Sequence, residues 1–343
     1  MFDRAAAILE LLRPRSLAAT RKTLGDLLAE VRDLKRTHLE TTRELQQQLA
    51  ALTVRESQLR AVMRTDVEQK EARRRLRTVL DLPRIVSHVQ RSVAAAELRL
   101  DPFPHCVVSR VLPEDFYDAL LEGIPPEELF GDRSFNKQHL TVPFAVAPRY
   151  SRRVWAYMAQ VVLKEALQPA LVEKFRVPLA EWISANWPDL APDPLGPPMD
   201  FKVSDGRILL RGRGYVIPPH RDPKWGFLTT ILYLAGPKDS EAWGTQLFSV
   251  GDDPEAKGAA PHWIDVGACR GRVDVPFRRN TALVFLNSIG AHGAHIPEDA
   301  KPDNLRRYVY QFRIGPSPAS MRALVELLPS ERRALWAGKI AEV

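Results

Sequence analysis

The chain has 343 residues, a formal net charge of +7 and 45% hydrophobic residues, enough for one large domain or for a catalytic domain with an appendage. The charge is uneven: residues 1–100 carry 20 Lys and Arg against 13 Asp and Glu, whereas residues 101–343 carry 29 of each kind. Residues 1–100 also contain one Gly, two Pro and no Trp. The composition therefore predicts two segments of different character.

Several classes of protein are disfavoured at this stage. The sequence contains no run of 18 apolar residues, so no membrane-spanning helix is predicted. The apolar stretch Ala5–Leu12 lacks a signal-peptide cleavage site, so a cytoplasmic protein is expected. Cys106 and Cys269 lack the spacing of a disulfide framework or a zinc ribbon. The basic residues alternate with acids at helical spacing, so a nucleic-acid partner is not favoured either.

The N-terminal third has a heptad pattern that predicts a helical arm over residues 1–82. The first column of the heptad is mostly apolar and consists of Leu24, Val31, His38, Leu45, Leu52 and Leu59. The second column loses its apolar character after Leu34 and consists of Leu27, Leu34, Thr41, Gln48, Arg55 and Val62. Two interpretations stay open. The arm forms a coiled coil that makes a homodimer, or it packs on its own catalytic domain.

The remainder predicts an α+β fold. Helical patterns dominate residues 83–200, and after a Pro-rich linker the pattern changes to short strands; they are Ile208–Leu210, Tyr215–Ile217, Phe227–Leu234, Thr245–Val250, His262–Val266, Arg272–Pro276, Thr281–Leu286 and Tyr308–Ile314. So many short strands in succession predict a jelly roll or sandwich at residues 201–315. Residues 316–343 are expected to form C-terminal helices, within 319–340.

A candidate metal site lies in the β-rich half. His220 and Asp222 are two residues apart in an extended segment, so both side chains point to the same side. A third ligand is expected from His292 or His295, in a turn after the strand Thr281–Leu286. Two histidines and one carboxylate on one face of a metal, with the other face open, is the ligand set of non-haem Fe(II) oxygenases.

These motifs, in this order, resemble the 2-oxoglutarate/Fe(II)-dependent dioxygenases of the prolyl 4-hydroxylase-like branch. The resemblance covers about residues 100–315; it includes the opening segment Pro102–Leu121, Gly214-Tyr215, His220-Arg-Asp222-Pro223, the strand ending in Tyr233-Leu234, Gly244–Phe248, His292-Gly293 and Arg307-Tyr308. It implies a double-stranded β-helix (jelly roll) catalytic core with flanking helices, preceded by the helical arm.

The resemblance also implies roles for individual residues. His220, Asp222 and His292 correspond to the iron ligands, and Arg307 corresponds to the arginine that pairs with the far carboxylate of the cosubstrate 2-oxoglutarate; an Arg fork suits a carboxylate. Tyr233 and Tyr215 correspond to residues near the same cosubstrate, and Gln311 is a further hydrogen-bonding candidate from the same strand. Fe(II) and 2-oxoglutarate are the implied cofactors, with ascorbate as a further candidate.

The spacing leaves two assignments open. The family usually has about ten residues between the distal histidine and the arginine, whereas fifteen separate His292 from Arg307 and eleven separate His295 from Arg306. His292 is preferred because a Gly follows it, as in the family.

The predicted function is hydroxylation of an unactivated C–H bond of an unknown substrate, a prolyl residue or a small molecule, with release of succinate and CO₂. The alternatives are a non-catalytic jelly-roll scaffold on a coiled-coil stalk, and a cupin-type enzyme without 2-oxoglutarate that would need His262 or His295 as extra ligands.

Overall fold

The computed structural model describes residues 14–131, 137–140, 144–190, 193–196, 199–223, 225–251 and 262–336. The chain divides into two compact units, residues 1–60 and 61–343. None of the described helices is long and apolar enough to cross a membrane. The cytoplasmic location stays a prediction.

The predicted helical arm is confirmed as a long helix, α2, which runs from Pro14 to Glu68. The large apolar side chains of its heptad columns are exposed: Leu24, Leu45 and Leu52 each expose about 60% of their surface. The coiled coil and the homodimer stay predictions. From Ala61 onward the helix is part of the second unit, where Ala61 is buried.

Buried residues of helices α3 to α9 in the second unit form one core with the larger sheet. The helices after α2 are α3 (Lys70–Val79), α4 (Leu82–Ala95), α5 (Glu114–Glu122), η1 (Glu127–Leu129), η3 (Phe144–Val146), α6 (Arg149–Tyr157), the π-helix η4 (Met158–Leu167), α7 (Gln168–Lys174), α8 (Arg176–Asn186), η5 (Val266–Ala268), α9 (Pro318–Glu326) and α10 (Ser330–Trp336). The start of α4 is set by Asp81, whose side chain accepts a hydrogen bond from the Arg84 N–H, and by Pro83 in the first turn. The part of the predicted C-terminal helix beyond residue 336 lies outside the described residues.

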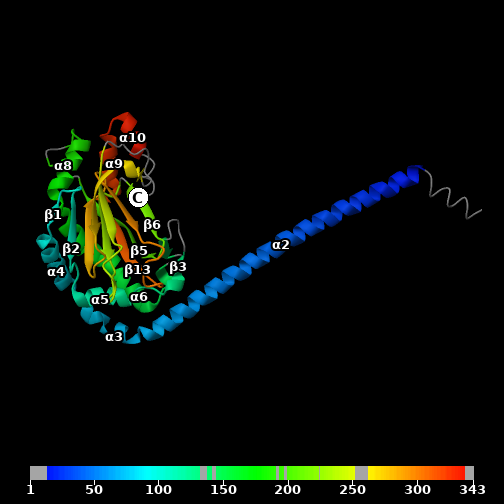
Figure 1. Cartoon of the computed structure of the whole chain (residues 1–343), viewed down its shortest axis with the longest axis horizontal. Coiled ribbons are helices and arrows are strands. Elements are labelled where there is room, and N and C mark those ends of the chain that lie inside the picture. Colours follow the sequence, from blue (N-terminus) through cyan, green and yellow to red (C-terminus); the bar gives the residue numbers. More distant parts are fainter. Residues whose placement is uncertain are drawn as a thin grey trace, which may run out of the picture. The chain divides into compact units, whose positions relative to one another are not determined.

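Two antiparallel sheets form the β-rich half (Figure 1). The strands are β1 (Leu98–Arg99), β2 (His105–Ser109), β3 (Phe130–Gly131), β4 (Lys137–Leu140), β5 (Phe201–Arg211), β6 (Val216–Arg221), β7 (Leu228–Tyr233), β8 (Thr245–Val250), β9 (His262–Trp263), β10 (Cys269–Val275), β11 (Thr281–Leu286), β12 (Ala291–His295) and β13 (Arg307–Pro316). The larger sheet has the order β1-β2-β11-β7-β13-β5-β4-β3, and the smaller one β10-β8-β12-β6-β9.

The strand order identifies a jelly roll. From β5 to β8 and from β10 to β13, successive strands alternate between the two sheets. This winding is that of a double-stranded β-helix, with β5, β13, β7 and β11 facing β6, β12, β8 and β10. The α+β class and the jelly-roll core expected from the sequence agree with this topology.

The larger sheet separates two hydrophobic cores, and side chains from its two faces pack into one core each. On β13, Tyr310 and Phe312 pack against helices α4 to α8, while Val309 packs inside the β-sandwich with residues of both sheets, such as Tyr233 and Leu247. Because side chains alternate along a strand, Arg307, Gln311 and Arg313 share the inner side with Val309. The inner side of β13 therefore combines apolar packing with two buried arginines.

The structure corrects several boundaries. His292 and His295 lie on a strand, β12, and not in a turn, because they pair with β6 across the smaller sheet. The predicted strand over 262–266 is shorter and gives way to η5. Within the predicted helical region 83–200, residues 149–174 form three consecutive helices, α6, η4 and α7. The domain limits at 82, 200 and 315 fall within the second unit and stay predictions.

Candidate metal centre

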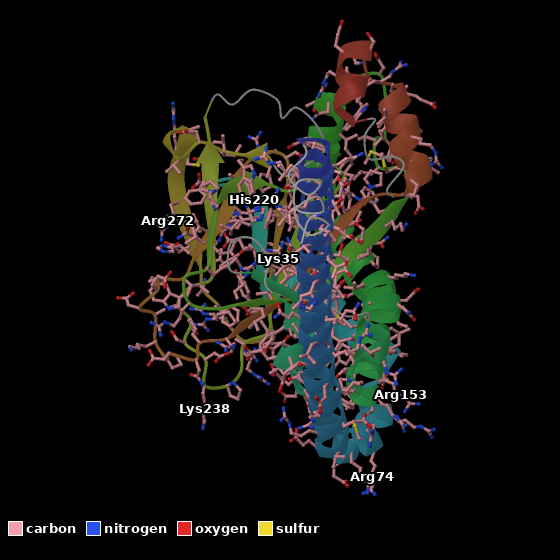
Figure 2. The ribbon with its side chains drawn as sticks, turned by 90° about the vertical axis from the view of Figure 1, so that its right-hand side faces the viewer. Lys35, Arg74, Arg153, His220, Lys238 and Arg272 are labelled. Atoms are coloured by element: carbon pink, nitrogen blue, oxygen red, sulfur yellow. The ribbon has the colours of Figure 1, made fainter. Side chains whose placement is uncertain are left out.

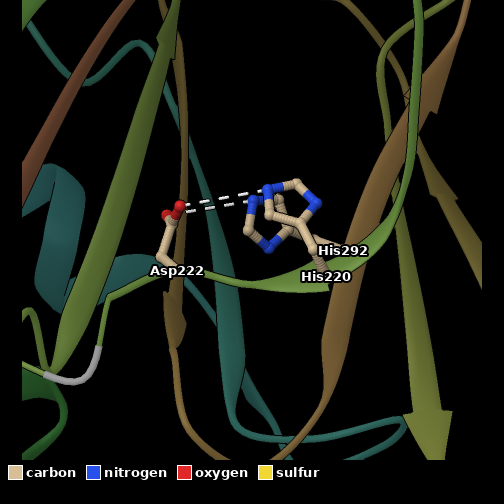
Figure 3. Close-up of side chains that lie close together, drawn as sticks. All are labelled: His220, Asp222 and His292. Carbon is tan, nitrogen blue, oxygen red and sulfur yellow. Dashed lines mark ion pairs between the residues drawn. The ribbon is translucent and has the colours of Figure 1, made fainter. Parts of the chain in front are cut away.

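Two neighbouring strands of the smaller sheet bring the predicted ligands together. His220 lies on β6 and Asp222 directly follows its end, while His292 lies on β12. His220 and His292 are register partners across the two strands, and their ring centroids are 4.1 Å apart. Figure 3 shows both imidazoles facing the Asp222 carboxylate.

The donor atoms of these three residues fit a single metal ion. The Nε2 atoms of His220 and His292 are each 3.9 Å from an oxygen of Asp222. Two donors bound to one ion at about 2.1 Å each stand no more than about 4.2 Å apart, so these distances suit a common ion. All three side chains are buried, and among the described residues they form the one group of this kind (Figure 2 shows His220 among the strands).

The alternative distal ligand lies elsewhere. His295 is exposed at the end of β12, where it pairs with Val216, and it does not belong to the group of donors. Three residues separate it from His292, so its side chain leaves the strand on the other side. The side chain of His262 lies outside the described residues.

The ring of His220 has a fixed orientation. Its Nδ1 lies 2.9 Å from the carbonyl oxygen of Pro218, which can only accept a hydrogen bond, so Nδ1 donates and Nε2 keeps its lone pair. Such a contact to the remote nitrogen is typical of metal-binding histidines. His292 is held by packing instead, with its ring centroid 4.7 Å from that of Phe285.

Asp222 is held by a group of donors that reach its carboxylate from the larger sheet. Arg313 Nη2 donates to Oδ1 over 2.7 Å, and Thr229 Oγ1 donates to Oδ2 over 2.8 Å. Gln311 Nε2 is a weaker donor at 3.4 Å. Burial by itself would raise the pKa of Asp222, but Arg313 and the two imidazoles outweigh it and hold that pKa far below its ordinary value. The carboxylate is therefore ionised at neutral pH.

The backbone around Asp222 is fixed by one amide side chain. Asn287 accepts a hydrogen bond from the Asp222 N–H, and its Nδ2 donates to the carbonyl oxygens of Asp222, Pro223 and Gly226. Because Asn287 is buried at the end of β11, it ties the loop after β6 to the larger sheet.

The pKa of His292 is shifted in the direction that metal binding requires. Burial lowers it well below the ordinary value, and the neighbouring His220 lowers it further, while Asp222 acts in the opposite direction. The imidazole is therefore neutral at neutral pH. A neutral imidazole is the form that binds a metal.

The predicted cosubstrate residues also lie on the inner side of the sandwich. Arg307, Tyr233 and Tyr215 are fully buried, and their guanidinium nitrogens and hydroxyls have no hydrogen-bond partner among the described residues. Arg306 is different: it is partly exposed and pairs with Glu127 at 2.7 Å. Of the two candidate arginines, Arg307 is the one inside the sandwich.

Sequence reasoning did not single out Arg211 and Arg313. Arg211 ends β5, is 7% exposed, and has its guanidinium carbon 5.0 Å from the centre of the Tyr215 ring. For Arg313 a signal was available, because it alternates with Arg307 and Gln311 along one face of a predicted strand. For Arg211 the signal was weaker, since it lies at the edge of a short predicted strand.

Neither a protein-family model nor a curated protein matches this chain. Solved structures similar to it include a prolyl hydroxylase from Trichoplax adhaerens in complex with a hypoxia-inducible-factor peptide (12% identity, 70% of this chain and 92% of that chain, TM-score 0.39). A Pseudomonas putida prolyl-4-hydroxylase is 14% identical, over 67% and 98% of the chains, with a TM-score of 0.36. HygX from Streptomyces hygroscopicus, solved with nickel, 2-oxoglutarate and hygromycin B, is 14% identical, over 62% and 83%, with a TM-score of 0.37.

These solved structures are prolyl hydroxylases and a 2-oxoglutarate-binding protein, the group that the sequence resembles. At such identities and TM-scores, the assignment of a function rests on the residues of this chain. Those residues fit the implied groups. The donor set suits a divalent metal such as Fe(II), and the buried, unpartnered Arg307, Tyr233 and Tyr215 suit an anionic ligand beside it.

Proposed function

We propose that this protein is an Fe(II)- and 2-oxoglutarate-dependent dioxygenase that hydroxylates an unactivated C–H bond. The observation that carries the proposal is one buried cluster, His220, Asp222 and His292, on the same inner side of a jelly roll as Arg307, a buried cation without a partner among the described residues. A buried cation with no partner is costly, so an anionic ligand is the expected complement.

Each residue of the metal centre would have a distinct role. His220, Asp222 and His292 would hold Fe(II), which with 2-oxoglutarate and O₂ supplies the oxidation of a C–H bond and releases succinate and CO₂. The hydrogen bond from His220 to Pro218 keeps Nε2 available, and Arg313 with Thr229 keeps Asp222 ionised and oriented. Burial of the whole cluster excludes bulk water.

The cosubstrate would be bound through its negatively charged far carboxylate. Arg307 would pair with the far carboxylate of 2-oxoglutarate through its planar fork. The hydroxyl of Tyr233, whose pKa burial raises to about 12, stays protonated and can donate a hydrogen bond to the same group. Burial also raises the pKa of Tyr215, so its hydroxyl is a second neutral donor on this side.

The substrate would be a prolyl residue of a protein or a small molecule. The test of the proposed activity is conversion of 2-oxoglutarate to succinate and CO₂ by the purified protein with Fe(II) and ascorbate. Activity in the wild type and none in His220→Ala supports the enzyme. A wild-type protein that binds no divalent metal and forms no succinate would instead favour a scaffold.

We further propose that α2 pairs with a second copy of this chain. The apolar column Leu24, Val31, Leu45, Leu52 and Leu59 is exposed along a helix of 55 residues. A single helix gains little stability from its own hydrogen bonds in water, whereas burying a seven-residue apolar repeat against a copy of itself stabilises both helices.

A further inference from the structure

Arg211 and Arg307 stand directly opposite each other on neighbouring strands. They are register partners in the antiparallel pair of β5 and β13, at the end of β5 and the start of β13. Side chains at such positions leave the sheet on the same side, with Cβ atoms about 5 Å apart. Like charges placed opposite each other in this way destabilise a sheet unless something compensates for them.

Both arginines are buried, and within the described residues all three guanidinium nitrogens of Arg307 and the Nε of Arg211 lack a hydrogen-bond partner. Arg307 exposes 1% of its surface and Arg211 exposes 7%. The contacts that the structure shows are with aromatic rings: Arg307 lies 4.4 Å from the centre of the Phe277 ring, and Arg211 lies over Tyr215. Ring contacts leave the N–H donors of Arg307 and the Nε–H of Arg211 without acceptors.

Arg211 also acts on Tyr233. Burial raises the pKa of the Tyr233 hydroxyl to about 12, and the charge of Arg211 acts in the opposite direction. The Tyr233 hydroxyl lies beside Thr245, whose contact with it also lowers the pKa of Tyr233. Two arginines, two tyrosine hydroxyls and a threonine hydroxyl are therefore buried donors in this part of the second unit.

A purely structural role does not account for this pair. An arginine that stabilises a fold from inside is paired, as Arg313 is with Asp222 at 2.7 Å. The acidic group that acts on the pKa of Arg307 is Asp239, which is exposed. Two buried cations side by side are therefore best explained by a ligand that brings the negative charge.

We propose that Arg211 and Arg307 form a two-arginine clamp on the far carboxylate of the keto-acid cosubstrate, with Arg211 as a second anchor beside the arginine that the sequence identifies. This inference rests on the proposed function. The clamp selects a 2-oxo acid whose tail ends in a carboxylate over one with an uncharged tail of similar length.

The test measures binding to the full-length, Ni(II)-loaded protein by calorimetry, so that turnover is not required. The two probes are 2-oxoglutarate and 2-oxopentanoate, which lacks the far carboxylate. The variants are Arg211→Gln and Arg307→Gln. The control is Arg213→Gln, a partly exposed arginine in the turn after β5 that pairs with Asp303.

Each clamp variant is expected to weaken 2-oxoglutarate binding by about ten- to a hundredfold, the usual cost of a charge-assisted hydrogen bond, and to leave 2-oxopentanoate binding unchanged. Arg213→Gln should bind both probes as the wild type does. Should Arg211→Gln fail to fold, Arg211→Lys replaces it. Lysine lacks the planar fork, so a smaller loss confined to 2-oxoglutarate supports the clamp, and an unchanged affinity contradicts it.

Two results overturn the clamp while the proposed function stands: unchanged 2-oxoglutarate binding in Arg211→Gln, or an equal loss for both probes, which would mean that Arg211 only shapes the pocket. A wild-type protein that binds Ni(II) but neither keto acid overturns the cosubstrate itself, and with it the proposed function.

Discussion

Arg313 and Asp222 form a buried ion pair, with Arg313 Nη2 2.7 Å from Asp222 Oδ1 and both side chains less than 5% exposed. The pair links β13 of the larger sheet to the end of β6 in the smaller one. Because Asp222 is the candidate carboxylate ligand, Arg313 sets both its charge and its orientation. If the pair only stabilises the fold, replacing Arg313 leaves metal binding unchanged. If Arg313 positions Asp222, replacing it weakens metal binding.

Replacing Arg313 should weaken metal binding. In Arg313→Gln, Asp222 loses its main cationic partner, and loss of such an orienting contact typically costs about ten- to a hundredfold in metal affinity. Metal-free protein should lose about 3–5 kcal/mol of stability, because a buried carboxylate is left without its ion pair. Titration with Co(II) or Ni(II) and thermal unfolding measure the two effects.

The matched control is Arg278→Gln, which removes a surface ion pair with Glu241. Such pairs contribute at most about 1 kcal/mol, and this one is on the outside of the protein. Wild-type metal affinity in Arg313→Gln would show that Arg313 has no positioning role.

Substitution of the two histidines on β12 should separate their roles. His292→Ala removes a buried donor and should abolish tight binding of a divalent metal, whereas His295→Ala changes an exposed residue and should bind metal as the wild type does. Metal content after dialysis is a direct measurement. The reverse pattern would make His295 the ligand.

Acid should destabilise the metal-free protein in two separate pH ranges. The pKa of His292 is lower in the folded chain than in the unfolded one, so as pH falls below about 6.5 the unfolded chain takes up a proton that the folded chain does not, and stability falls. The lowered pKa of Asp222 stabilises the fold above its ordinary range, and this contribution is lost as pH falls below about 3.8.

The contribution of His292 to the upper range can be separated from that of His105, whose pKa burial also lowers. The melting temperature of metal-free wild type should fall between about pH 7.5 and pH 5.5, and His292→Gln should show a smaller fall, because the titrating group is gone. A His292→Gln protein with the wild-type slope would show that another group causes the acid sensitivity.

The sequence was most informative where a short-range pattern decides the geometry. Residues 220 and 222 of one extended segment must face the same side, and the structure places both in the buried donor group. Apolar strands with β-branched residues, such as Thr281–Leu286, were also found with their exact bounds.

What sequence alone missed depends on pairing between distant strands. Arg211 became notable only through its register with Arg307, almost a hundred residues later. Arg313 could have been noticed on its predicted strand face, but its role became visible only through its contact with Asp222. The strand β12 was mistaken for a turn because Gly293 and two histidines weaken its β propensity. Pairing with β6 and β8 on either side outweighs that weakness.

The proposed pairing of α2 predicts the oligomeric state. Full-length protein should be a dimer by light scattering, and the double variant Leu45→Glu with Leu52→Glu should be a monomer, because it places charges in the apolar column. Gln47→Glu, on another face of the same helix, should remain dimeric. A monomeric wild type would contradict the pairing without affecting the metal centre.

The proposed activity requires that one buried cluster binds Fe(II) and 2-oxoglutarate together. Anaerobic addition of both to the full-length protein should produce the visible charge-transfer absorption of a keto acid chelated to Fe(II), and neither component alone should produce it. The band should be absent in Asp222→Ala and present in Arg213→Gln. No band in the wild type, or an equal band in Asp222→Ala, would show that this cluster does not bind the two together.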